Sequence, residues 1–141
     1  MSLSTPSTDF AQVTSYTNIT DSIDLEVLRS FDDPEAPIED SLMIELIDLY
    51  LVETSRLLES LREAIQGSDI DFITLKAHSL KGSSGNLGIT AMASLSERLE
   101  HFRPGGPTRL ELLEELEQEF ARVNTILTDE RGRRVDANTD R

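Results

Sequence analysis

The chain has 141 residues, enough for one domain with a hydrophobic core and not comfortably for two. Hydrophobic residues make up 38% of the chain and aromatic residues only 5%, which is typical of a helical domain packed by leucine, isoleucine and alanine. With 27 acidic and 13 basic residues the formal net charge is -14, and so negative a surface repels nucleic-acid phosphates and anionic lipid headgroups. The absence of cysteine excludes disulfide scaffolds, thiol nucleophiles and cysteine-ligated metals.

The apolar segments are all shorter than the roughly 18 to 20 residues that a membrane-spanning helix requires. The polar N-terminus also lacks the pattern of a signal peptide, which has a basic stretch followed by an apolar one. We therefore expect a cytoplasmic protein that binds neither membranes nor nucleic acid.

Both ends of the chain are predicted to be flexible. Residues 1–20 are rich in serine and threonine and show no sustained apolar period, so we predict an N-terminal arm. A short helix is expected from Asp21 to Phe31, with Asp21 or Ser22 as its cap. The segment DDPEAPIED then interrupts it, because its two prolines cannot continue a helix. Residues 130–141 have no apolar face, and we predict a C-terminal tail that frays.

Four longer segments repeat apolar residues at steps of three and four, the period of amphipathic helices. These predicted helices are Asp40 to Gln66, Ile70 to Leu87, Thr90 to Phe102 and Thr108 to Leu127. Short connections between successive amphipathic helices favour antiparallel neighbours. We therefore predict an all-α fold, an antiparallel up-down four-helix bundle with a short additional N-terminal helix, occupying residues 21–129.

The predicted helix from Ile70 to Leu87 contains two glycines, although each glycine inside a helix costs about 0.8 to 1 kcal/mol relative to alanine. Gly82 and Gly85 share one helical face with His78 and Lys81, because positions i, i+3, i+4 and i+7 lie on the same side of a helix. This face is turned by roughly 100° from the apolar seam of the same helix, so His78 is expected to be at least partly exposed. The apolar seam comprises Ile70, Ile73, Ala77, Leu80, Ser84 and Leu87.

Such a face suits phosphoryl transfer. An imidazole nitrogen is a nucleophile at neutral pH, so Nε2 of His78 is a candidate acceptor of a phosphoryl group. Lys81, one turn later, would attract the phosphoryl oxygens as a compact positive charge. Gly82 and Gly85 would let the backbone of a partner come close. An isolated histidine on a helix is more often a plain surface residue, but this combination is much less common.

Other functions fit the residues less well. Gly82, Gly85 and Gly88 spell G-x-x-G-x-x-G, but a nucleotide-binding loop requires a different spacing, and a dinucleotide fingerprint also follows a strand. His78 and His101 lie on different predicted helices without an HExxH-type pairing, which disfavours a metal site. We interpret His101 as a helix-end residue that the helix dipole favours.

Residues 77–88, A-H-S-L-K-G-S-S-G-N-L-G, resemble the phosphorylation-site motif of the histidine phosphotransfer (HPt) family. The resemblance extends over about residues 21–129, because family members are similar antiparallel helical bundles with the active histidine midway along one long helix. It implies that His78 is the phospho-acceptor, that Lys81 steadies the phosphoryl group, and that Gly82 makes space for a receiver domain.

The resemblance also implies the partners, which are response-regulator receiver domains and, as a further candidate, a hybrid sensor histidine kinase. Gly82, Gly85, Ser79 and Lys76 are expected at the docking surface. Because nothing in the sequence resembles an ATP-binding domain, we expect a phosphoryl carrier and not an enzyme. Receiver domains bring their own Mg²⁺, so no cofactor or metal is expected on this chain, which we expect to be a monomer.

The main alternative is an interaction-only module, a bundle of this fold that binds receiver or kinase domains without carrying phosphate. The presence of His78 argues against it. Following labelled phosphate from phosphorylated receivers to the protein would separate the two functions.

Overall fold

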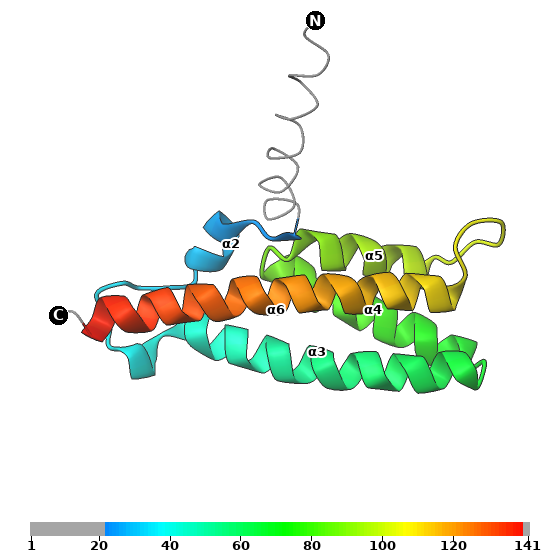
Figure 1. The fold of residues 1–141 in the computed structure, drawn as a ribbon, viewed down its shortest axis with the longest axis horizontal. Coiled ribbons are helices and arrows are strands. Elements are labelled where there is room, and N and C mark those ends of the chain that lie inside the picture. The colour runs from blue at the N-terminus through cyan, green and yellow to red at the C-terminus, as the bar shows by residue number, and fades with distance from the viewer. Residues whose placement is uncertain (1–21, 140–141) are drawn as a thin grey trace, which may run out of the picture.

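The structure is a computed structural model that describes residues 22–139, and every regular element within this range is a helix. The bundle consists of α3 (Leu42–Gln66), α4 (Ile70–Asn86), α5 (Thr90–Glu100) and α6 (Arg109–Thr139), which lie side by side in Figure 1. A short helix, α2 (Leu25–Arg29), and a 3-10 turn, η1 (Ile38–Asp40), precede it. The predicted all-α bundle is confirmed. None of the helices in the described range is long and apolar enough to cross a membrane.

Side-chain caps define where the bundle helices begin. The Ser41 hydroxyl accepts a hydrogen bond from the amide three residues later at 3.2 Å and so starts α3. The Asp69 carboxylate does the same for α4, also at 3.2 Å. At the start of α6, Thr108 and Glu111 satisfy each other's backbone amides at 3.0 and 2.8 Å, which is a capping box.

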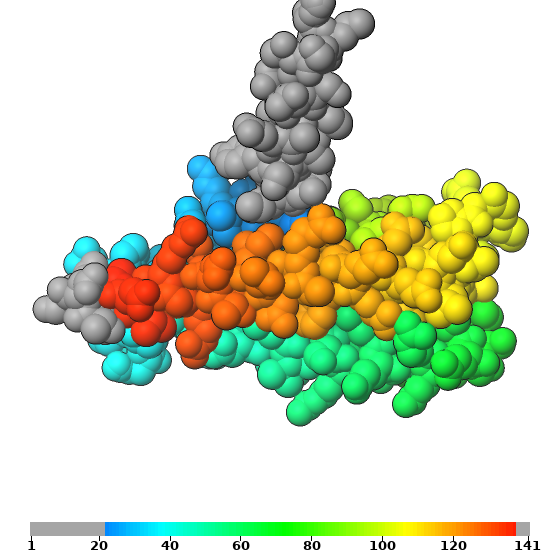
Figure 2. Space-filling view, viewed as in Figure 1, coloured from blue at the N-terminus to red at the C-terminus, as the bar shows by residue number. Residues whose placement is uncertain are grey.

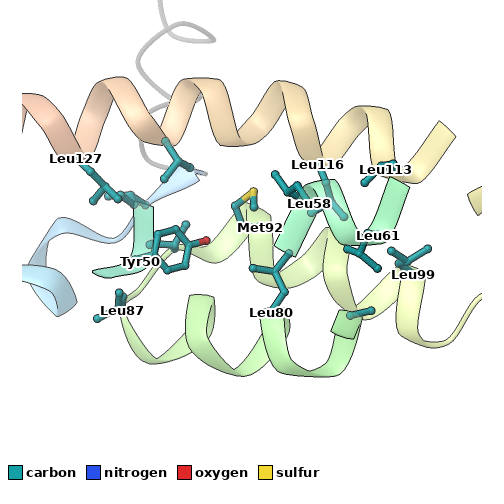
Figure 3. Close-up of a cluster of buried hydrophobic side chains, with 14 of the residues drawn as sticks. Tyr50, Leu58, Leu61, Leu80, Leu87, Met92, Leu99, Leu113, Leu116 and Leu127 are labelled. Atoms are coloured by element: carbon teal, nitrogen blue, oxygen red, sulfur yellow. The ribbon is translucent and has the colours of Figure 1, made fainter. Parts of the chain in front are cut away.

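Apolar side chains from α3, α4, α5 and α6 meet in one core, part of which is drawn in Figure 3. Most of the predicted seam of α4 points into it, whereas Ile70 in the first turn is 41% exposed. Tyr50 of α3 and Ser84 of α4 are both buried there, with their hydroxyl oxygens 2.7 Å apart. Burial raises the pKa of Tyr50 to about 12, so this hydrogen bond stays neutral over the physiological pH range.

The predicted N-terminal helix, Asp21 to Phe31, is wrong in its extent. The structure has the five-residue α2, and its cap is Asp24 instead of Asp21 or Ser22. The amide of Asp24 donates a hydrogen bond to the carbonyl of Gly88 at 2.7 Å. The chain is thus held against the end of α4 immediately before α2, and α2 begins only after Asp24, whose backbone is extended. The predicted arm, residues 1–20, lies outside the described residues.

The predicted flexible tail, residues 130–141, is also wrong over residues 130–139, because α6 continues through Thr139, and residues 140 and 141 lie outside the described residues. The inward positions keep the helical steps of three and four residues, and they are occupied by Val123, Leu127, Glu130 and Arg134. The last two of these residues carry charges. Glu130 accepts two hydrogen bonds from the Arg29 guanidinium, at 2.6 and 2.9 Å. The bundle therefore extends beyond the predicted boundary at residue 129. A search for apolar residues misses this continuation because charged residues occupy the inward positions.

Arg134 links the last turns of α6 to the connection between α2 and α3 by hydrogen bonds. Its Nε lies 2.8 Å from a carboxylate oxygen of Asp32, and both side chains are less than a tenth exposed. Its Nη2 donates to the carbonyl oxygens of Asp33 and Ala36 at 3.1 and 2.6 Å. In the space-filling view, the red end of α6 lies against this cyan connection (Figure 2).

Candidate functional site

His78 lies near the middle of α4 and points away from the core, with 63% of its side chain exposed. This confirms the predicted exposure. Apart from His78, the exposed residues on the same side of α4 between positions 74 and 86 carry no formal charge: Thr74, Leu75, Ser79, Gly82, Ser83, Gly85 and Asn86. On a chain with a net charge of -14, α4 therefore offers a partner a surface on which few charges need to be desolvated.

The two glycines of this face have no packing role inside the chain. A Cβ atom built at Gly82 or at Gly85 would meet nothing within 4 Å. Alanine would favour the helix at either position, so neither the backbone nor the core explains the glycines. This is consistent with the expectation that a partner uses the empty space.

Glu100, at the C-terminal end of α5, is the functional candidate that the sequence did not single out. One of its carboxylate oxygens, Oε2, lies 2.7 Å from Nδ1 of His78, and the other, Oε1, lies 2.8 Å from Nζ of Lys81. An ionised carboxylate can only accept hydrogen bonds, so Nδ1 of His78 must donate the proton. This leaves the lone pair of the imidazole on the exposed Nε2, the atom expected to carry the phosphoryl group.

The charges of this site stabilise one another. The Lys81 ammonium and, next, the hydrogen bond from His78 hold the pKa of Glu100 below its usual value, while Glu100 raises the pKa of Lys81. A carboxyl group whose pKa is lowered by folding contributes stability above its unfolded pKa and loses it as the pH falls through the folded value. The Glu100 carboxylate therefore holds His78 and Lys81 from neutral pH down to below 4.5, the ordinary value for glutamate.

The other predicted site residues surround this centre. Ser79 is exposed beside His78, whereas Lys76 is half-buried with its ammonium 5.3 Å from the ring centre of Phe72. The structure thus brings Lys81, but not Lys76, into the site. His101 is 61% exposed, and its Nε2 lies 3.7 Å from Oε1 of Glu100. Across residues 22–139, no three histidine, aspartate or glutamate side chains are grouped so that they could hold a metal ion.

We expect Glu100→Gln to slow phosphoryl acceptance by His78 about 10- to 100-fold, by comparison with carboxylates that orient metal-binding histidines. The amide carries no charge to hold the proton on Nδ1. The measurement is the transfer rate together with the ring ¹⁵N shifts of His78, which report the tautomer.

Glu59→Gln is the control, because Glu59 is exposed on α3, outside the lining of the pocket at the end of α5, and has no hydrogen bond or ion pair to His78. If Glu100→Gln kept both the wild-type rate and the Nδ1–H tautomer, Glu100 would have no orienting role. Equal unfolding free energies of the two variants would separate this role from a loss of fold.

The chain matches known proteins in both sequence and structure. The model of the Hpt domain family matches residues 45–126, which include His78, Lys81 and Glu100. The chain is 32% identical to a protein of known structure, histidine-containing phosphotransfer protein B (HptB) from Pseudomonas aeruginosa PAO1. The two structures superpose with a TM-score of 0.70 over 79% of this chain and 96% of that chain. No curated protein matches the sequence.

The matched range contains α4 and α5 whole and most of α3, whereas α2, η1 and the last turns of α6 lie outside it. Family members are phosphoryl carriers that work with receiver domains and kinases. Because the family model covers more than half of the chain, this protein belongs to the Hpt domain family and is a histidine phosphotransfer protein of a two-component phosphorelay.

Proposed function

We propose that the protein accepts a phosphoryl group on Nε2 of His78 from the phosphoaspartate of one receiver domain and donates it to the aspartate of another. The hydrogen bond of 2.7 Å between Nδ1 of His78 and Glu100 carries the proposal, because in the neutral imidazole it keeps the proton on Nδ1 and leaves the lone pair on Nε2 of an exposed side chain. A receiver of a hybrid sensor histidine kinase is a suitable donor. The carrier acts as a monomer in the cytoplasm under this proposal.

The transfer step balances without a base on this chain. The Nε2 lone pair of His78 attacks the phosphorus, and the bond from phosphorus to the receiver's aspartate oxygen breaks as the P–N bond forms. The aspartate leaves as a carboxylate, and the imidazole, which keeps its Nδ1 proton, becomes a cation. Glu100 stabilises this new positive charge at 2.7 Å, and return of the phosphoryl group to an aspartate reverses each change.

Lys81 supplies the positive charge for the phosphoryl oxygens. Its side chain is 30% exposed and its ammonium is held 2.8 Å from Glu100, one helical turn from His78. An ammonium on a flexible stem can turn from Glu100 toward a phosphoryl group on Nε2 without a change in the helix. The Mg²⁺ of the reaction belongs to the receiver, so the chain requires no cofactor of its own.

The proposed function is tested by incubating the protein with Mg²⁺ and receiver domains that carry labelled phosphate. We expect label to move to the protein, and then onward to a second, unphosphorylated receiver. A complex that forms without any transfer of label would instead support the interaction-only module.

Gly82→Gln is expected to impair transfer by about 10-fold or more, since a clash of only about 1.4 kcal/mol in the docked complex has that effect. The free energy of unfolding should stay the same or rise by up to about 1 kcal/mol, because glutamine favours a helix more than glycine does. Transfer kinetics and thermal unfolding measure the two effects separately.

Gly132→Gln provides the control for Gly82→Gln. Gly132 also lies within a helix with nothing within 4 Å of an added Cβ, but it belongs to α6. If Gly82→Gln relayed phosphate as fast as Gly132→Gln, a close approach of the receiver at Gly82 would be excluded.

A further inference from the structure

The connection between α5 and α6 forms a pocket of about 620 Å³ next to the site. Its apolar lining includes Phe102 and the buried Leu112, and its charged lining consists of Glu97, Arg98, His101 and Arg103. In Figure 1 this connection is the yellow loop, at the opposite end of α6 from the Arg134 contacts.

The guanidinium groups at this pocket are free to take a further carboxylate. Arg103 is exposed and forms no ion pair within the described part of the chain. Arg98 approaches Glu115 only to 3.9 Å, and both side chains are about half exposed. Arg109 lies over the ring of Phe102, with its guanidinium carbon 4.0 Å from the ring centre. Arg98 and Arg103 thus outnumber Glu97 in the lining of the pocket, on a chain whose net charge is -14.

The pocket is continuous with the phosphorylation site. His101 lines it, and Nε2 of His101 lies 3.7 Å from Oε1 of Glu100, whose other oxygen holds His78. A protein that docks stably covers roughly 800 Å² of its partner, about 20 to 30 residues. A receiver centred on His78 therefore covers more than the uncharged face of α4, and the pocket is within its reach.

We propose that this pocket is a second docking element for the receiver, and that it binds an acidic side chain of the receiver together with a neighbouring apolar one. The inference rests on the proposed function. Receivers hold Mg²⁺ beside their aspartate, and Mg²⁺ sites are built from carboxylates, so their surface is acidic where it faces His78. Arginine forks bind carboxylates with two hydrogen bonds, and the apolar lining accommodates the neighbouring side chain.

Glycine amides serve as reporters of the interface in an NMR titration. The titrant is a receiver that exchanges phosphate with the wild-type protein, added unphosphorylated with Mg²⁺. Gly82 and Gly85 report the α4 face, Gly105 and Gly106 the pocket loop, and Gly132 the far end of α6. We expect the first four amide signals to shift along one binding curve while that of Gly132 does not. Shifts confined to Gly82 and Gly85 would exclude the pocket and leave the proposed function intact.

A charge reversal tests the energetic role of the pocket. Arg103→Glu is expected to lower the second-order rate constant of transfer about 3- to 10-fold at low ionic strength, because a charge at the edge of an interface acts mainly on association. The difference should shrink as salt shortens the Debye length. Arg133→Glu is the matched control, since Arg133 is also exposed and without an ion pair but lies near the other end of α6.

Direct labelling with phosphoramidate, which requires no docking, separates the possible failures. Equal labelling of wild type, Arg103→Glu and Arg133→Glu would show that His78 is intact in all three. Equal transfer rates in Arg103→Glu and Arg133→Glu would then overturn the pocket inference alone. Failure of the wild-type protein to exchange phosphate with any receiver, despite labelling by phosphoramidate, would overturn the proposed function and this inference with it.

Discussion

His78→Gln is expected to abolish the transfer of labelled phosphate from receivers to the protein. The glutamine amide has no nucleophilic lone pair on nitrogen, whereas the imidazole presents Nε2 at an exposed position. The fold should be unchanged, because the substituted side chain makes no core contact and glutamine favours a helix. Gel detection of the label, together with circular dichroism, measures both effects.

His101→Gln is the control, and it should still be labelled, because His78 is intact. His101 is 61% exposed and His78 63%, so accessibility does not distinguish the two residues. The Nδ1 contact with Glu100 and the position on the uncharged face of α4 do distinguish them. The phosphoramidate bond is labile in acid and stable in base. An acid-stable label, or label that persists in His78→Gln, would place the phosphate on another side chain.

Arg134→Ala should lower the free energy of unfolding by about 3 to 5 kcal/mol, the usual cost of removing one partner from a buried ion pair. Arg134 and Asp32 are 6% and 8% exposed, so water cannot replace the lost guanidinium easily. The substitution also leaves the carbonyl oxygens of Asp33 and Ala36 without this donor. Since domains are stable by only about 5 to 15 kcal/mol, urea denaturation should show a large shift in midpoint.

The neighbouring Arg133→Ala is the control for Arg134→Ala. Arg133 is exposed and forms no ion pair within residues 22–139, so its loss should change the free energy of unfolding by less than about 0.5 kcal/mol. Adding Asp32→Asn to Arg134→Ala should recover part of the loss, because it removes the unpaired buried charge. Similar effects of Arg133→Ala and Arg134→Ala would mean that the last turns of α6 do not stabilise the bundle.

The sequence predicts the bundle because its helices bury apolar residues at a regular period. Ile73, Ala77 and Leu80 lie inside as the steps of three and four require. The same rule fails in the last turns of α6, where Glu130 and Arg134 occupy the inward positions. These charges are buried only because Arg29 and Asp32, about 100 residues earlier, neutralise them. Periodicity of apolar residues carries no information on such pairs.

The site was predictable to the extent that it lies on one helix. His78, Lys81, Gly82 and Gly85 share a face of α4, and the helical period is sufficient to bring them together. Glu100 belongs to α5, and the sequence contains 27 acidic residues with nothing to distinguish this one. Its role follows only from the antiparallel packing of α4 against α5, which places its carboxylate 2.7 Å from an imidazole 22 residues earlier.

The buried hydrogen bond between Tyr50 and Ser84 sets the angular phase of α4. Ser84 follows His78 by six residues, which corresponds to a turn of about 240° around the helix axis. While Tyr50 holds Ser84 inward, the imidazole points toward Glu100, and one residue gained or lost between them would swing it away by about 100°. Substitutions between His78 and Ser84 can therefore adapt the surface to different receivers, whereas an insertion or deletion there would turn His78 away from Glu100.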